Sequence, residues 1–93
     1  MNNQGAQFYF GNLGADVMRC ALAATGGDEK KYEDSFARAQ KTLSFLRAVG
    51  RPEAYEEGLL LLRGLVYARE DGTLDVFSRD LNKMISVIMN PLH

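Results

Sequence analysis

The sequence predicts an all-α fold in which four antiparallel helices form a small up-down bundle of two helical hairpins. Apolar residues recur at three- and four-residue spacing, which is the period of an amphipathic helix. Breaks that contain glycine divide residues 1–93 into four segments of helical length within a single domain. No segment alternates apolar and polar residues as a half-buried strand does. Because the breaks are short, consecutive helices must fold back on one another.

The first predicted helix spans residues 7–25, and the second spans residues 29–49. Gly26 and Gly27 can end the first helix because glycine readily adopts positive φ, and the Asp28 side chain can cap the second helix. A further glycine ends the second helix. Its apolar stripe, expected to face the core, consists of Tyr32, Phe36, Ala39, Leu43 and Leu46.

The third predicted helix spans residues 52–70, and the fourth spans residues 74–90. Pro52 suits the first helical position because the N–H that proline lacks would have no partner there in any case. Gly72 separates the two helices, and Thr73 can cap the fourth. The core stripe of the third helix is Tyr55, Leu59, Leu62, Leu65 and Val66, and that of the fourth is Leu74, Phe77, Leu81, Met84, Ile85 and Ile88.

The first predicted helix differs from the others because it is apolar on nearly all sides. Its core stripe consists of Ala6, Phe10, Leu13, Val17, Cys20 and Ala24, and a second stripe on the opposite side consists of Phe8, Gly11, Ala15, Met18 and Leu22. Only a narrow strip, formed by Asn12, Asp16 and Arg19, is polar. Each helix of a four-helix bundle keeps one face outside, so the second stripe has no obvious place within one chain.

We expect the second stripe to be an interface with another protein. A glycine inside a helix costs about 0.5–1 kcal/mol relative to alanine, and close approach of another backbone would compensate for Gly11. Phe8, Met18 and Leu22 would then pack as knobs around the groove at Gly11 and Ala15. The expected partner is a second copy, giving a homodimer, or another protein. The alternative is that the first helix lies centrally and the rest of the chain covers both of its stripes.

Three apolar residues outside the core stripes are candidates for secondary contacts. Phe45 lies off the stripe of the second helix, whereas Leu60 and Tyr67 share the otherwise polar side of the third. Scattered exposed apolar residues are normal in soluble proteins, so these three rank below the second stripe of the first helix.

Residues suited to catalysis or metal binding are scarce. The chain has one histidine and one cysteine, and no histidine falls in a predicted helix where it could act as a base for Cys20. The Glu-x-x-His units of a di-metal bundle are also missing. The glycines match neither the Walker pattern nor the dinucleotide-binding pattern. The sequence therefore predicts no enzyme activity, no cofactor and no metal site.

The charge balance and the apolar runs exclude further classes of function. Eleven Lys and Arg residues against twelve Asp and Glu residues give a net charge of -1. Nucleic-acid-binding proteins normally carry a basic excess, so we expect no nucleic-acid partner. The longest apolar runs, residues 20–24 and 59–62, are far below the ~20 residues of a membrane span, and no secretory signal pattern is visible. A single cysteine also fits a reducing compartment, so we expect a cytoplasmic protein with no membrane partner.

Part of the chain resembles a tetratricopeptide repeat. Gly27-Asp28 followed by Phe36 and Ala39 has the rhythm of that motif's second helix. The first helix is longer than the motif allows, and no second copy follows, whereas such arrays need about three repeats to be stable. We interpret the resemblance as a shared helical-hairpin rhythm. A second hypothesis for function is a small-molecule or regulatory binding domain with an apolar cavity between the hairpins, near Cys20 and Met84.

Overall fold

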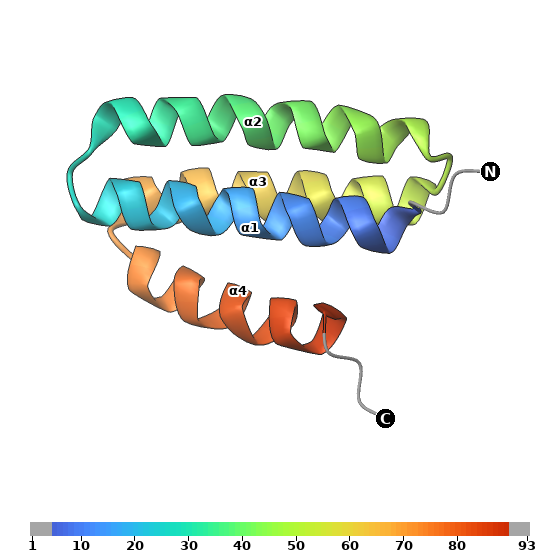
Figure 1. Cartoon of the computed structure of the whole chain (residues 1–93). Coiled ribbons are helices and arrows are strands. Elements are labelled where there is room, and N and C mark those ends of the chain that lie inside the picture. Colours follow the sequence, from blue (N-terminus) through green and yellow to red (C-terminus); the bar gives the residue numbers. More distant parts are fainter. Residues whose placement is uncertain (1–4, 90–93) are drawn as a thin grey trace.

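Four helices account for most of the residues that the structure describes. The computed structural model describes residues 5–89, with side chains up to residue 86. The helices are α1 (Ala6–Thr25), α2 (Glu29–Ala48), α3 (Pro52–Asp71) and α4 (Leu74–Met89). Each described boundary lies within one residue of the predicted one, and the predicted end at Asn90 lies outside the described residues. Figure 1 shows that consecutive helices run in opposite directions, and residues 5–89 contain no strand.

The helix ends are set by the capping, glycine and proline residues that the sequence analysis identified. The Asp28 side chain accepts a hydrogen bond from the backbone N–H of Lys31 at 3.1 Å and so caps α2. Gly72 ends α3 in the left-handed conformation, with φ of 76°, which a residue with a side chain rarely adopts. Pro52 begins α3, where its missing N–H leaves no helical hydrogen bond unmade.

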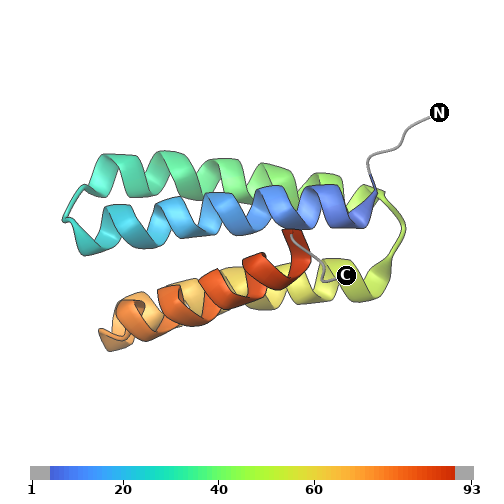
Figure 2. The same ribbon diagram turned by 60° about the horizontal axis from the view of Figure 1, so that its bottom comes forward.

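Helix α1 occupies the centre of the arrangement. It contacts α2, α3 and α4, whereas α2 and α4 do not touch each other within the described part of the chain. Figure 2 shows the α1–α2 pair lying over the α3–α4 pair. A helix with neighbours on several sides needs more apolar surface than one at the edge, which explains why α1 is apolar on nearly all sides.

The core consists of large aliphatic side chains from all four helices. The fully buried members are Leu13, Val17 and Cys20 of α1, Leu46 of α2, Leu65 of α3, and Leu81 of α4. Gly58 lets α3 approach this core closely, because a Cβ there would lie 2.8 Å from Leu13 Cδ2 and 2.9 Å from Leu43 Cδ1.

The buried stripe of α3 is rotated relative to the predicted one. Leu62 and Leu65 are buried as expected, but Leu59 and Val66 are only half-buried. The buried residues of α3 are Gly58, Leu61, Leu62, Leu65 and Ala68. The rotation follows from the neighbours of α3, because α4 lies along this helix as well as α1 and α2.

Candidate functional site

The second stripe of α1 is divided among different environments. Phe8 and Leu22 are 45% and 63% exposed, so both ends of the stripe face solvent. Gly11 is buried, and Ala15 and Met18 are half-buried. The structure therefore does not bring the five predicted interface residues together as one continuous exposed surface.

Helix α4 packs against α1 beside this stripe. A Cβ at Gly14 would lie only 3.0 Å from Ile85 Cγ1, so α4 packs closely against α1 at this position. Gly14 lies one turn after Gly11 and one turn before Met18, so these residues share one side of the helix. Met18 also packs against the hydrophobic core. The close approach that glycine allows is thus made, at Gly14, by a helix of the same chain.

An exposed cluster of aromatic side chains joins the start of α1 to the second half of α2. The Phe8 and Tyr9 rings meet edge-to-face with centroids 5.2 Å apart, and Tyr9 contacts Phe45 with centroids 5.8 Å apart. Phe45 is 46% exposed, close to the value for Phe8. We call Phe8, Tyr9 and Phe45 the aromatic patch.

Sequence reasoning treated Phe8 and Phe45 as members of separate surfaces and missed Tyr9. The predicted α1–α2 hairpin is the feature from which their proximity could have been inferred. A tight break between two helices of equal length places the start of the first beside the end of the second. Position along the hairpin, rather than position around each helix, brings these three rings together.

The other two candidate contact residues lie at the edges of shallow grooves. Leu60 borders an apolar groove of about 340 Å³ between α1, α3 and α4, whose further lining residues are Phe10, Glu57, Leu61, Phe77 and Met84. Tyr67 borders a groove of about 280 Å³ between α2 and α3, whose further lining residues are Phe36, Gln40, Leu43, Leu59, Leu62, Arg63 and Val66. Both residues are exposed.

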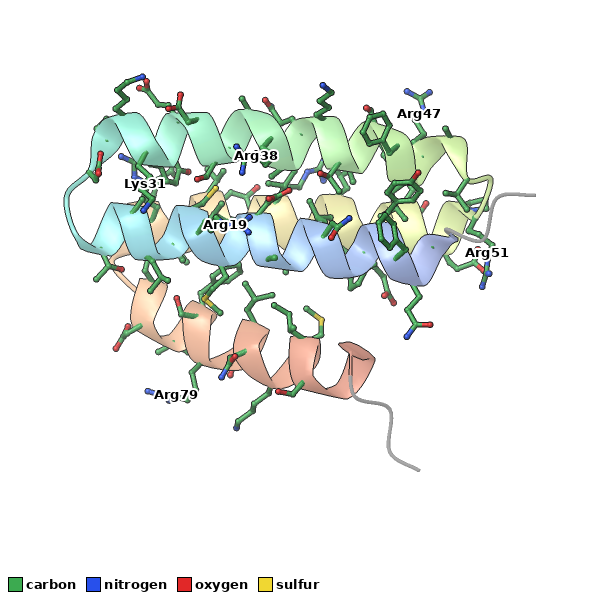
Figure 3. All side chains as sticks on the ribbon, in the orientation of Figure 1. Arg19, Lys31, Arg38, Arg47, Arg51 and Arg79 are labelled. Carbon is green, nitrogen blue, oxygen red and sulfur yellow. The ribbon has the colours of Figure 1, made fainter. Side chains whose placement is uncertain are left out.

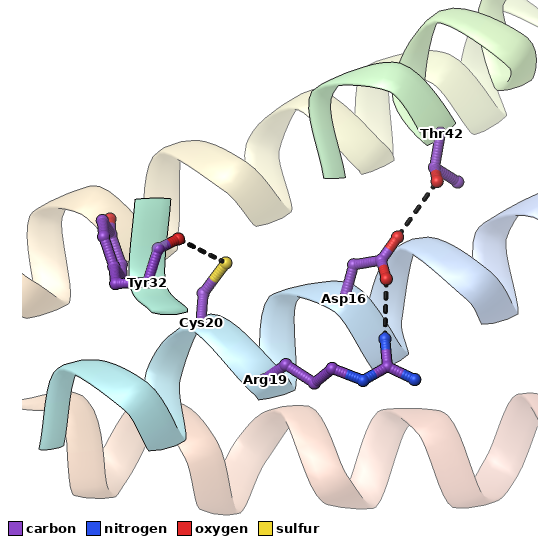
Figure 4. A network of polar contacts seen from close by, with 5 residues as sticks. All are labelled: Asp16, Arg19, Cys20, Tyr32 and Thr42. Carbon is purple, nitrogen blue, oxygen red and sulfur yellow. Dashed lines mark hydrogen bonds and ion pairs between the residues drawn. The ribbon is translucent and has the colours of Figure 1, made fainter. Parts of the chain in front are cut away.

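Cys20 lies in the core between α1 and α2 and borders neither of these grooves. Its Sγ points toward the backbone oxygen of Tyr32 at 3.9 Å, as Figure 4 shows. Burial raises the pKa of the thiol from 9.0 to about 11, and the negative charge of Asp16 adds to this effect. The thiol is therefore protonated at neutral pH and poorly suited to nucleophilic chemistry. Met84 lines the groove beside Leu60 whereas Cys20 does not, although both were expected beside one cavity.

Asp16 is buried under α2 rather than lying on a surface strip. Its side chain is 6% exposed, and Oδ1 accepts a hydrogen bond from Arg19 Nη1 at 2.7 Å. The other oxygen, Oδ2, accepts one from Thr42 Oγ1 at 3.0 Å (Figure 4). Both carboxylate oxygens therefore have a donor, which offsets the cost of burying the charge.

Neither a metal-binding cluster nor a membrane-spanning helix is found in the described residues. No group of three or more His, Cys, Asp or Glu side chains within residues 5–89 is placed to hold a metal ion. None of the helices in that range is long and apolar enough to cross a membrane. Comparison of the chain with protein-family models, with curated proteins and with solved structures finds no match.

Proposed function

We propose that this chain is a small non-enzymatic helical protein that associates with a second copy of itself through the start of α1. The observation that carries the proposal is the aromatic patch. Two of its rings are nearly half exposed, and its third ring holds them together. Aromatic side chains are enriched at protein interfaces because they bury a large area at a low cost in conformational entropy.

The patch suits contact between identical copies. A two-fold dimer brings the same surface of both chains together, so the surface must be complementary to itself. Aromatic rings meet this condition because pairs of rings pack edge-to-face or offset, each pair contributing about 0.5–1.5 kcal/mol beyond the area that it buries. Leu22 follows Phe8 by 14 residues, about 21 Å along the helix, so it belongs to the other end of α1.

Light scattering on the purified protein tests the proposal. We expect the mass of a dimer at micromolar concentrations, and we expect Phe8→Asp and Phe45→Asp each to return it toward 10.3 kDa. Val76→Asp is the matched control, because Val76 of α4 is 45% exposed, as Phe8 is, but lies outside the patch. A monomeric mass at every concentration, or equal effects of Phe8→Asp and Val76→Asp, would refute the proposal.

Two variants define how far the interface extends along α1. Leu22→Asp places a charge at the far end of the helix, and we expect it to change the mass less than Phe8→Asp does. Ala15→Leu enlarges a half-buried residue in the middle of the helix. If circular dichroism shows that this variant has lost helicity, then Ala15 belongs to the packing of the single chain.

A cytoplasmic location fits this proposal. The one cysteine of the chain is a free, buried thiol, so no disulfide contributes to the fold of the described residues. Small domains of oxidising compartments are commonly stabilised by disulfides, whereas a fold that rests on its core alone is typical of reducing compartments. Fluorescence microscopy of a tagged chain in cells tests the location.

A second candidate function is the binding of an apolar small molecule in the groove beside Leu60. The groove measures about 340 Å³, which reaches the lower end of the roughly 300–1,000 Å³ range of ligand pockets. Its lining is apolar except for Glu57. If this groove is the site, then a fluorescent hydrophobic dye should bind saturably, and Met84→Trp should block binding. Tyr67→Ala, in the other groove, is the control.

A further inference from the structure

A polar groove on the α1–α2 pair is independent of the aromatic patch and of the two apolar grooves. Its volume is about 260 Å³, and its lining residues are Asn12, Ala15, Asp16, Arg19, Arg38 and Thr42. Figure 3 shows that the Arg19 and Arg38 side chains come from different helices and lie over the seam between them. Two guanidinium groups therefore border one small hollow.

The guanidinium group of Arg19 is held in place by a buried anchor. Its Nη1 donates to Asp16 Oδ1 at 2.7 Å, and Asp16 is fixed in turn by Thr42. The Arg19 side chain is still 50% exposed, and its guanidinium group carries further N–H donors besides the one bonded to Asp16. A donor that is already oriented loses less conformational entropy when a ligand binds.

Arg38 carries a charge that no acidic side chain in the described residues balances. Asp34, one turn before it, makes its ion pair with Lys30 at 3.5 Å instead. No ion pair or hydrogen bond of the Arg38 side chain is found in the part of the chain described. With Asp16 negative and Arg19 positive, the groove holds a formal excess of one positive charge.

We propose that this groove binds a small ligand that carries an oxyanion, either a phosphate or a carboxylate group. Guanidinium groups bind the oxygens of the planar carboxylate group and of the tetrahedral phosphate group through paired, charge-assisted hydrogen bonds. Arg38 supplies the unbalanced charge, Arg19 supplies donors in a fixed position, and the Asn12 amide supplies a neutral donor. Asp16 acts as a positioning residue, since both of its oxygens already accept hydrogen bonds within the chain.

A titration followed by NMR tests this site. Inorganic phosphate is added to the ¹⁵N-labelled protein at low ionic strength, and the Nε–Hε signals of the arginine side chains are recorded. Sodium acetate forms a second arm that distinguishes a carboxylate from a phosphate. We expect saturable shifts of the Arg19 and Arg38 signals with at least one of the two anions. Shifts that stay linear with both anions would overturn the proposal.

Two matched variants show whether binding depends on the groove. Arg38→Gln is expected to weaken binding by about tenfold or more, which corresponds to about 1.4 kcal/mol, and to leave the fold intact because Arg38 is exposed. Arg79→Gln removes an arginine of α4 that is also exposed but lies away from the groove, and should leave binding unchanged. Equal losses in both variants would mean general attraction of counterions and would refute the site. Phe8→Asp should bind the anion normally, which separates this inference from the proposed dimer.

Discussion

The Thr42 hydroxyl group is expected to contribute more to stability than its small size suggests. It donates to a carboxylate that is buried between α1 and α2, and hydrogen bonds to charged groups contribute about 1.5–3 kcal/mol. Thr42→Val keeps the shape of the side chain and removes the donor. We expect the free energy of unfolding, measured by urea denaturation, to fall by an amount in this range.

Thr25→Val is the matched control for this change. The Thr25 hydroxyl donates to the backbone oxygen of Ala21, one turn earlier in the same helix, and the residue is exposed. Its removal should therefore change the free energy of unfolding by less than about 0.5 kcal/mol. Similar losses in the two variants would show that Asp16 does not depend on the hydrogen bond from α2.

The Cys20 thiol makes stability depend on pH in the alkaline range. Its pKa rises from 9.0 to about 11 because the folded chain buries it. Below pH 9 both the folded and the unfolded chain keep the proton, whereas between pH 9 and 11 the unfolded chain loses it first. The free energy of unfolding should therefore fall as the pH rises through this window.

Cys20→Ala isolates the contribution of this thiol from every other source of pH dependence in the chain. The variant is less stable at pH 7 because it leaves a small cavity, but its stability should fall less steeply between pH 9 and 11. Chemical denaturation at several pH values provides the comparison. Equal slopes for the two proteins would mean that the thiol is not protected from ionisation in the folded state.

The contact between α3 and the α1–α2 pair depends on Gly58. A Cβ at this position would lie 2.8 Å from Leu13 Cδ2, 2.9 Å from Leu43 Cδ1 and 3.0 Å from Leu46 Cδ2. Because these neighbours lie in a packed core, they cannot all move away. Gly58→Ala should therefore lower the free energy of unfolding by about 1–2 kcal/mol, although alanine is the better helix former.

Gly64→Ala provides the comparison within the same helix. Its Cβ would meet only the ring of Phe77, at 3.2 Å, and that ring is half-buried and has room to shift. We expect a smaller loss than for Gly58→Ala, measured by the same urea denaturation. A larger loss would place the tightest contact of α3 at α4 instead of at α1 and α2.

The helix boundaries could be predicted because local chemistry sets them. Asp28, Pro52 and Gly72 act within one turn of their own positions, and their effect is visible in the sequence. The face that each helix buries depends on which helices lie beside it. For α3 this dependence rotated the buried stripe, because residues on the α4 side are covered as well.

The environment of Asp16 and the aromatic patch could not be derived in the same way. The sequence places Asp16 on a polar surface strip of α1. Its partner in the folded chain is Thr42 of α2, which is 26 residues away and therefore not visible in the local pattern. Phe8 and Phe45 are linked only once the α1–α2 hairpin is formed. Pairing across helices, rather than periodicity within one helix, decides both features.

The four helices are too few to enclose a helix completely, and this limits what the molecule can bury. Helix α1 has α2, α3 and α4 as neighbours, and within this arrangement Gly11 is buried and Met18 is half-buried. Phe8 and Leu22, at the two ends of the helix, remain exposed. The apolar residues around α1 therefore have two explanations. Those in the middle of the helix follow from its central position among the other helices, and those at its two ends form an exposed surface.

If the aromatic patch is covered by a second copy, then thermal stability must depend on protein concentration. Association stabilises only the folded chain, so each tenfold increase in concentration adds up to about 0.7 kcal/mol per chain of a dimer. For a domain of this size that amount corresponds to a rise in Tm of roughly 3–6 °C. Differential scanning calorimetry over a hundredfold range of concentration measures it. Phe8→Asp should melt at one temperature throughout the range, whereas Val76→Asp should keep the concentration dependence of the unmodified chain, because its substitution lies outside the patch. A constant Tm for the unmodified chain would instead indicate that the exposed rings of Phe8 and Phe45 remain in water.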